Sequence, residues 1–493
     1  MNIGFQLTSI SPRTIKLVLI GMGIAMAGLL GRVVPSWGIQ VLAGLLAPVG
    51  ALLVLSQPVL GMYFLAAAIP LEGVSALGGG LTIIRLGGIF LFGAWLIPKL
   101  LRRESWRPLV STGLFKAALL FAFFALTSML WAMSTSKTSE FLFQLLRLIL
   151  WSLLIADLAN SWERMAWLAK MLVIGAQITA TLTIHQFLTT GMRAGAGIGG
   201  GINATAYLMV AVVPFAFYLL QAKENRFWSL VGLLYLGTAC GAVAVTFSRT
   251  SYIMLSLVVL AQYWETIKTG VGRGKLILLA GVAVVALVVL MPRDLVTERV
   301  QSIASYVRLG IQGKENEEGV LPSRGFILHV GLAIFRDHPL IGVGYGNFGD
   351  AYLIYQHRVP YTYSGYTNKA NRSPHNSYLG LLTEVGLIGL LLFWGLMAGI
   401  VLRNLIISWS LLNKALDKTK PSKQLLFVQA LTYCFLLQFG YALARNIQEE
   451  KLFWLLLGLS ITVRNLVEQS RQSPVSNDNS SPVKQLSPSA TRL

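Results

Sequence analysis

The stretch "NRSPHNSYLGLLTEVGLIGLLLFWGL", residues 371–396, turns from polar to apolar without a linker. Its first six residues include an arginine, a histidine and two asparagines, and its second half is apolar enough for a lipid bilayer. The apolar run is continuous and not alternating, so it predicts a transmembrane helix and not a strand of a β-barrel. The polar residues therefore lie where the chain enters the membrane, and their chemistry depends on which side they face.

The composition extends this interpretation to the whole chain. The 493 residues are 55% hydrophobic and only 12% charged, with a mean hydropathy of +0.65. Soluble domains carry about 25% charged residues, so we expect an all-α polytopic membrane protein. The formal net charge of +20 lies largely in short loops, where it orients helices, and does not indicate nucleic-acid binding. Cys240 and Cys434 both lie in apolar runs and indicate neither a disulfide nor a metal site.

The hydropathy pattern predicts about 12 to 14 transmembrane helices, each of roughly 20 residues. The candidate spans are 14–31, 38–56, 58–71, 82–98, 113–133, 140–158, 165–187, 202–221, 228–247, 250–266, 276–291, 377–401, 425–443 and 451–466. The segment 58–71 is short for a span and is a candidate re-entrant segment.

The basic loops predict the orientation. They follow even-numbered spans, so the positive-inside rule places them, and both termini, in the cytoplasm. The resulting domains are an N-terminal bundle of about eleven spans (1–291), an extracytoplasmic catalytic loop (292–376), the C-terminal spans (377–467) and a disordered cytoplasmic tail (468–493).

The outer loop is about 85 residues long, and connections of this length tend to carry function. Within it, "LPSRGFILHVGLAIFRDHP" predicts a helix, with Ser323 as its N-cap and Pro339 after its end. "LIGVGYGNFG" (340–349) predicts a glycine-rich turn. The loop also carries seven tyrosines, Tyr345 among them, whose faces suit a sugar ring or form the core of a folded loop.

Three residues of this outer side could do chemistry. Arg249, in "TFSRTSY", falls in a tight connection between two spans, and Arg324 opens the predicted loop helix, where the helix dipole favours an anion. His375 follows Pro374 at the membrane edge and can exchange a proton near neutral pH. The structural alternatives are an arginine that snorkels to the interface, a solvated arginine and a histidine that caps the span.

Together these residues suit a substrate whose phosphates lie at headgroup depth. A polyprenyl diphosphate-linked oligosaccharide has its tail in the bilayer, its diphosphate at the interface and its sugars outside. The planar fork of arginine binds phosphate oxygens in pairs and would stabilise the leaving diphosphate. The histidine would deprotonate or orient an acceptor hydroxyl.

Three segments carry a family resemblance: "SRT" (248–250), "SRGFILHVGLAIFRDHPLIGVGYGNF" (323–348) and "PHNSYLGLLTEVGLIGLLLFWGL" (374–396). They resemble the O-antigen ligase/polymerase family of bacterial membrane glycosyltransferases over roughly 240–400. The resemblance implies a GT-C-like fold with a large, partly helical periplasmic loop in the bacterial inner (plasma) membrane. It also implies transfer of a glycan from undecaprenyl diphosphate, with no cofactor and no metal.

The resemblance assigns Arg249 and Arg324 to the diphosphate and His375 to the acceptor. Arg372 and Asn376 are further substrate-binding candidates by position, and Tyr345 is one by its aromatic face. The acceptor stays open: another lipid-linked glycan, as in polymerases, lipid A core, as in ligases, or a protein hydroxyl.

Two other functions compete with the enzyme. A membrane transporter of a small anion such as bicarbonate would use the basic outer side as an entry funnel. It would also place ionisable or helix-breaking residues near the midplane, where these spans carry few. A non-catalytic partner in envelope synthesis would tolerate His375→Ala.

Overall fold

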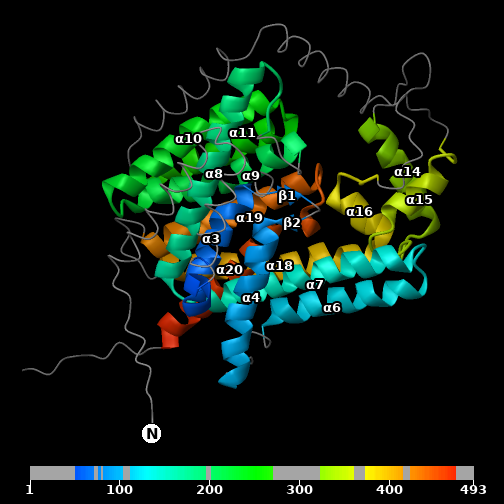
Figure 1. The fold of residues 1–493 in the computed structure, drawn as a ribbon, viewed down its shortest axis with the longest axis horizontal. Helices are drawn as coiled ribbons and strands as arrows, with labels where there is room; N and C mark the ends of the chain where they lie inside the picture. Colours follow the sequence, from blue (N-terminus) through cyan, green and yellow to red (C-terminus); the bar gives the residue numbers. More distant parts are fainter. Residues whose placement is uncertain are drawn as a thin grey trace, which may run out of the picture.

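The regular secondary structure of the described residues is helical, apart from one short hairpin. The computed structural model describes residues 50, 52–71, 76–78, 81–103, 112–195, 201–269, 323–359, 372–414 and 422–472. Within them, strands β1 (Ala76–Gly78) and β2 (Leu81–Thr82) pair antiparallel. Figure 1 shows the helices packed in one body.

The helices follow the predicted spans closely along the chain. Their bounds are α3 (Pro58–Ala68), η1 (Ile69–Leu71), α4 (Ile83–Leu101), α6 (Gly113–Thr127), η2 (Ser128–Leu130), α7 (Thr135–Leu158), α8 (Trp162–Thr190), α9 (Gly201–Ala222), α10 (Arg226–Thr246), α11 (Arg249–Thr269), α14 (Ser323–Asp337), α15 (Phe348–Tyr355), α16 (Ser377–Glu384), α17 (Gly386–Leu390), the π-helix η3 (Leu391–Met397), α18 (Ala398–Lys414), α19 (Lys423–Ala442), η4 (Ile447–Glu449) and α20 (Lys451–Gln472).

Seven of the described helices are long and apolar enough to cross a membrane. Their bounds are Gly113–Leu130, Thr135–Leu158, Trp162–Thr190, Gly201–Ala222, Arg226–Thr246, Gly386–Lys414 and Lys423–Ala442. Two shorter apolar helices, Pro58–Leu71 and Gly87–Leu101, accompany them. These helices confirm a multi-pass, all-α membrane protein. The expected spans 14–31 and 276–291, and most of 38–56, lie outside the described residues.

The core of the bundle forms around α9. Of the apolar stretch of this helix, 83% is buried inside the protein. Small residues allow neighbouring helices to approach closely, as is common in membranes. A Cβ on Gly175 of α8 would lie 1.9 Å from the Ala67 carbonyl oxygen of α3. A Cβ on Gly232 of α10 would lie 2.8 Å from the Ala216 carbonyl oxygen of α9. The short α3 is thus packed tightly inside the bundle.

The described part of the long loop builds a second, smaller core. Phe326 and Val330 of α14 pack with Phe348 and Tyr352 of α15, and Leu379 of α16 joins them. As expected, α14 ends before Pro339, and a glycine-rich turn follows it. Gly342, Gly344 and Gly346 in this turn all have positive φ angles, which explains why the segment needs glycine.

Polar contacts fix this loop to the turn between α6 and α7. The backbone N–H of Ser134 donates to the Asn347 side chain at 2.6 Å, and Lys137 pairs with Asp350 at 2.6 Å. The Glu384 carboxylate, at the end of α16, accepts the backbone N–H groups of Gly346 (3.0 Å) and Phe348 (3.4 Å). Figure 1 shows α14, α15 and α16 together at one end of the molecule.

Candidate functional site

The first turn of α16 fixes the position of His375. The Asn376 side chain caps this helix by accepting the backbone N–H groups of Tyr378 (2.9 Å) and Leu379 (3.1 Å). This cap lets α16 begin abruptly after Pro374, which is buried. His375 keeps an exposed edge and has a φ of +49°, in the left-handed region that residues other than glycine rarely adopt. Its unusual backbone therefore has to be held by its surroundings.

Three arginines act on the imidazole of His375. Its pKa is lowered from the usual value, first by burial and then by the positive charges of Arg324, Arg445 and Arg372. At neutral pH the ring is therefore neutral and able to accept a proton. The structure thus brings together Arg324, Arg372 and His375, which the sequence singled out, and adds Arg445, which it did not.

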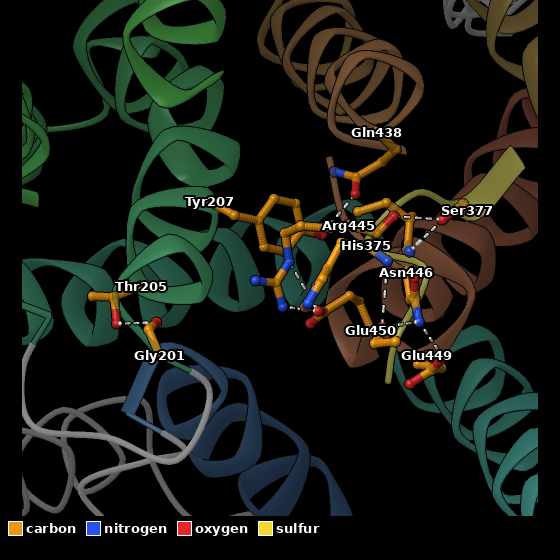
Figure 2. Close-up of polar contacts among 12 residues, drawn as sticks. Gly201, Thr205, Tyr207, His375, Ser377, Gln438, Arg445, Asn446, Glu449 and Glu450 are labelled. Carbon is orange, nitrogen blue, oxygen red and sulfur yellow. Dashed lines mark hydrogen bonds and ion pairs between the residues drawn. The ribbon is translucent and has the colours of Figure 1, made fainter. Parts of the chain in front are cut away.

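Arg445 comes from the short connection between α19 and α20. Its Nε donates to Glu450 Oε1 at 3.2 Å, and its guanidinium lies 5.3 Å from the centre of the Tyr207 ring. Burial disfavours its charge, but Glu450 outweighs that effect and the pKa of Arg445 is raised. Figure 2 shows this pair beside His375. A permanent positive charge is thus held in a half-buried position.

A line of hydroxyl and ring contacts leads from Arg445 to the beginning of α11. The rings of Tyr207 and Tyr441 lie 4.9 Å apart, and the Tyr441 hydroxyl donates to Ser251 Oγ at 3.1 Å. Ser251 is two residues after Arg249, which lies half-buried in the first turn of α11. Arg249 therefore lies at the same end of the bundle as His375.

Hydrogen bonds join the connection between α19 and α20 to residues 373–377, which we call the His375 segment. The Ser377 hydroxyl donates to the Arg445 carbonyl at 2.8 Å and accepts the Ile447 N–H at 2.6 Å. Asn446 Nδ2 donates to Ser373 Oγ at 3.0 Å. Movement of either segment would therefore displace the other. We call this region, where α19 ends and α16 and α20 begin, the His375 end of the bundle.

Tyr345 does not belong to the cluster around His375. Its side chain is only 3% exposed and packs edge-on against Phe121 and Phe141, with ring centres 5.9 and 6.2 Å away. The structure corrects the expectation that this ring faces a sugar, because the ring is part of the core. The Asn376 oxygen, another candidate for substrate, is already used by the helix cap.

Sequence reasoning missed Arg445, Asn446, Glu449 and Glu450. The signal that could have found them is their density, because "ARNIQEEK" (444–451) puts six polar residues into a short connection between two apolar spans. The cluster combines guanidinium groups with a neutral imidazole at one point. Such an arrangement can bind a multiply charged anion and take up a proton beside it. Among the residues that the structure describes, no group of His, Cys, Asp and Glu side chains is arranged to hold a metal ion.

Comparison with known families matches part of the chain. Residues 234–394 match a family model described as O-antigen ligase. This segment runs from α10 into η3 and includes Arg249, Arg324 and His375, but it ends before Arg445. No curated protein matches the chain. Neither finding supports the transporter.

Proposed function

The chain belongs to the O-antigen ligase/polymerase family through residues 234–394, and on this premise we propose its reaction. It transfers a glycan from an undecaprenyl diphosphate donor to an acceptor hydroxyl at the outer face of the bacterial inner membrane. The observation that carries the proposal is the convergence of Arg324, Arg372 and Arg445 on a neutral His375. The basic loops on the opposite side support the orientation, with the site periplasmic and both termini cytoplasmic.

The arginines bind the donor in this proposal. Arg324 is exposed in the first turn of α14 and makes no ion pair with any described residue, so its guanidinium is available to a phosphate. Arg372, which also acts on His375, and Arg249, at the same end of the bundle, are the further candidates for phosphate binding. When the bond between the anomeric carbon and the phosphate oxygen breaks, the diphosphate leaves with the electron pair. The guanidinium groups stabilise the charge that develops there.

His375 activates the acceptor. Its neutral imidazole accepts the proton of the acceptor hydroxyl while that oxygen forms the new bond to the anomeric carbon. Burial lowers the pKa of the ring, and the arginines add to this effect, so the groups that bind the diphosphate also help to keep the imidazole neutral. The donor's bond to diphosphate supplies the free energy, so the proposed reaction uses no cofactor, and the guanidinium groups take the charge-stabilising role that a metal ion has in other enzymes.

The test is release of polyprenyl diphosphate. Purified protein in liposomes receives a labelled lipid-linked oligosaccharide and a crude envelope acceptor, and the released diphosphate lipid and the glycan product are measured. His375→Ala should lower release about 10³-fold. His338→Ala is the matched control, because His338 is an exposed histidine of the same loop that contacts Tyr355 instead.

The product also identifies the acceptor. A ladder of glycan sizes indicates a polymerase, glycan on lipid A core indicates a ligase, and glycan on protein indicates an oligosaccharyltransferase. Full release by His375→Ala, or no release by the wild type with several donors, contradicts the proposal.

A further inference from the structure

His375 lies in a backbone conformation that requires support. Its φ of +49° falls in the left-handed region, and a residue with a side chain stays there only when contacts around it hold it. A proton acceptor must also meet the acceptor hydroxyl within hydrogen-bond distance, so small shifts of its backbone cost rate. The contacts that hold this turn are therefore part of the catalytic geometry.

Three hydrogen bonds in series hold the turn. The His375 N–H donates to Ser373 Oγ at 3.4 Å, and the same oxygen accepts from Asn446 Nδ2 at 3.0 Å. Asn446 Nδ2 donates its second hydrogen to Glu449 Oε1 at 3.0 Å. Figure 2 shows Asn446 between the His375 segment and Glu449.

The orientation of the Asn446 amide depends on Glu449. The amide oxygen is buried and has no hydrogen-bond partner among the described residues, so only the nitrogen side holds the group. An ionised carboxylate accepts hydrogen bonds and cannot donate them, so it permits only the orientation with Nδ2 towards it. Without it, the amide can turn over and present its oxygen to Ser373.

The Asn446 amide is the hydrogen-bond partner of the Glu449 side chain among the described residues. The neighbouring Arg445 is hydrogen-bonded to Glu450, and Glu449 acts on Arg445 through its charge. Glu449 also lies beyond residues 234–394, the segment matched to the family.

We propose that Glu449 is a positioning residue for glycan transfer, acting through Asn446 and Ser373 on the backbone of His375. This role rests on the proposed function, because it matters to the reaction only if His375 accepts the proton.

The first experiment measures the position of His375 without measuring activity. Full-length protein in liposomes is treated with diethyl pyrocarbonate, and mass spectrometry follows modification of His375. Burial, and with it Glu450, raises the pKa of Glu449 to about 7, so the assay is run at pH 8, where the carboxylate is ionised. Glu449→Gln keeps an acceptor oxygen but also presents a donor, so it no longer enforces one orientation of the Asn446 amide. It should change the modification rate about fivefold, the size of effect expected for one net hydrogen bond.

Two further variants complete the design. Ser373→Ala breaks the same series of hydrogen bonds at its other end and should change the modification rate in the same direction. Glu468→Gln is the matched control, because Glu468 is an exposed carboxylate of α20 that pairs with Arg464. It should leave the modification rate unchanged.

The second experiment measures transfer. Glu449→Gln should lower kcat about tenfold with an unchanged KM for the donor, since a displaced proton acceptor affects the chemical step. In a His375→Ala background, Glu449→Gln should cause no further loss, because residues that act through one another are not additive.

The outcomes separate the two proposals. Unchanged His375 modification in both Glu449→Gln and Ser373→Ala overturns the positioning role, and so does an additive loss of transfer in the double variant. Altered modification together with a wild type that transfers no glycan contradicts the proposed function, while the hydrogen-bonded link to His375 stands.

Discussion

The positive charges at the two ends of the helical bundle differ in whether each has a carboxylate partner. Away from His375, the side chain of Lys170 is only 1% exposed and pairs with Glu224. Its ammonium group also lies 4.5 Å from the centre of the Trp167 ring and 5.0 Å from that of Trp228. In the same way, Lys99 pairs with Asp157 at 2.7 Å. Each of these cations has a carboxylate of its own, as buried charges generally do.

At the His375 end, by contrast, several positive charges act on one imidazole. Arg445 has Glu450, but Arg324 makes no ion pair with any described residue. Like charges held together cost stability, so such a cluster is kept where a ligand compensates it. The difference indicates that the Lys170 pair stabilises the fold, and it supports our proposal that the arginines bind an anion.

The largest effect should come from Arg324→Ala, which should lower transfer about 10³-fold by removing a donor to the leaving diphosphate. Arg324→Lys should restore only part, because lysine lacks the bidentate fork. Single-turnover release of polyprenyl diphosphate measures both. Arg336→Ala, at the exposed end of the same helix, is the control. A wild-type rate in Arg324→Ala would show that this arginine does not bind the donor.

Glu224→Gln should show the opposite pattern. It leaves the buried Lys170 without its carboxylate, and an unpaired buried charge costs about 3 kcal/mol. The thermal midpoint in detergent should fall, while transfer per folded molecule stays the same. Adding Lys170→Met should recover part of the midpoint, because it removes the unpaired charge. Lost transfer at an unchanged midpoint would contradict the structural role of this pair.

Asn376→Ala tests whether this asparagine serves the helix or the substrate. Loss of an N-cap costs about 1 kcal/mol, so the thermal midpoint should fall slightly, and the KM for the donor should stay unchanged. Asn376→Ser, which can still cap, should recover the midpoint. A raised KM for the donor with an unchanged thermal midpoint would show that Asn376 binds the substrate.

The smallest effect concerns pH. Burial, and with it the three arginines, lowers the pKa of His375, so transfer should persist as the pH falls and disappear only when the imidazole protonates below its ordinary value of 6.5. Arg372→Gln removes one of these charges and should move this acidic loss of activity to higher pH. The pH dependence of kcat measures the shift. A shift to lower pH would contradict the electrostatic coupling.

The sequence predicted the spans and the first group of site residues because both depend on local patterns. Apolar runs such as 202–221 become helices wherever they lie, and α9 covers this one. Arg324 and His375 lie near the starts of helices, and the neighbouring Ser323 and Pro374 are the local signals that predicted these starts. The glycines of "LIGVGYGNFG" likewise predict the turn that their positive φ angles confirm.

The rest depended on contacts between distant segments. Arg445 reaches His375 because the Ser377 hydroxyl binds the α19–α20 connection, and no local pattern shows such a bond. Tyr345 was expected at a sugar because tyrosine suits both surface and core. Its burial is decided by Phe121 and Phe141, more than 200 residues earlier in the chain.

The same long-range contacts set an order for biosynthesis. Ser134 meets Asn347 across 213 residues, and Trp151 meets the Lys451 carbonyl across 300. The cluster draws on Tyr207, His375 and Glu450, so it is incomplete until nearly the whole chain has left the ribosome and entered the bilayer. A nascent or truncated chain therefore carries no assembled site, so the proposed transfer cannot begin before the C-terminal helices have joined the bundle.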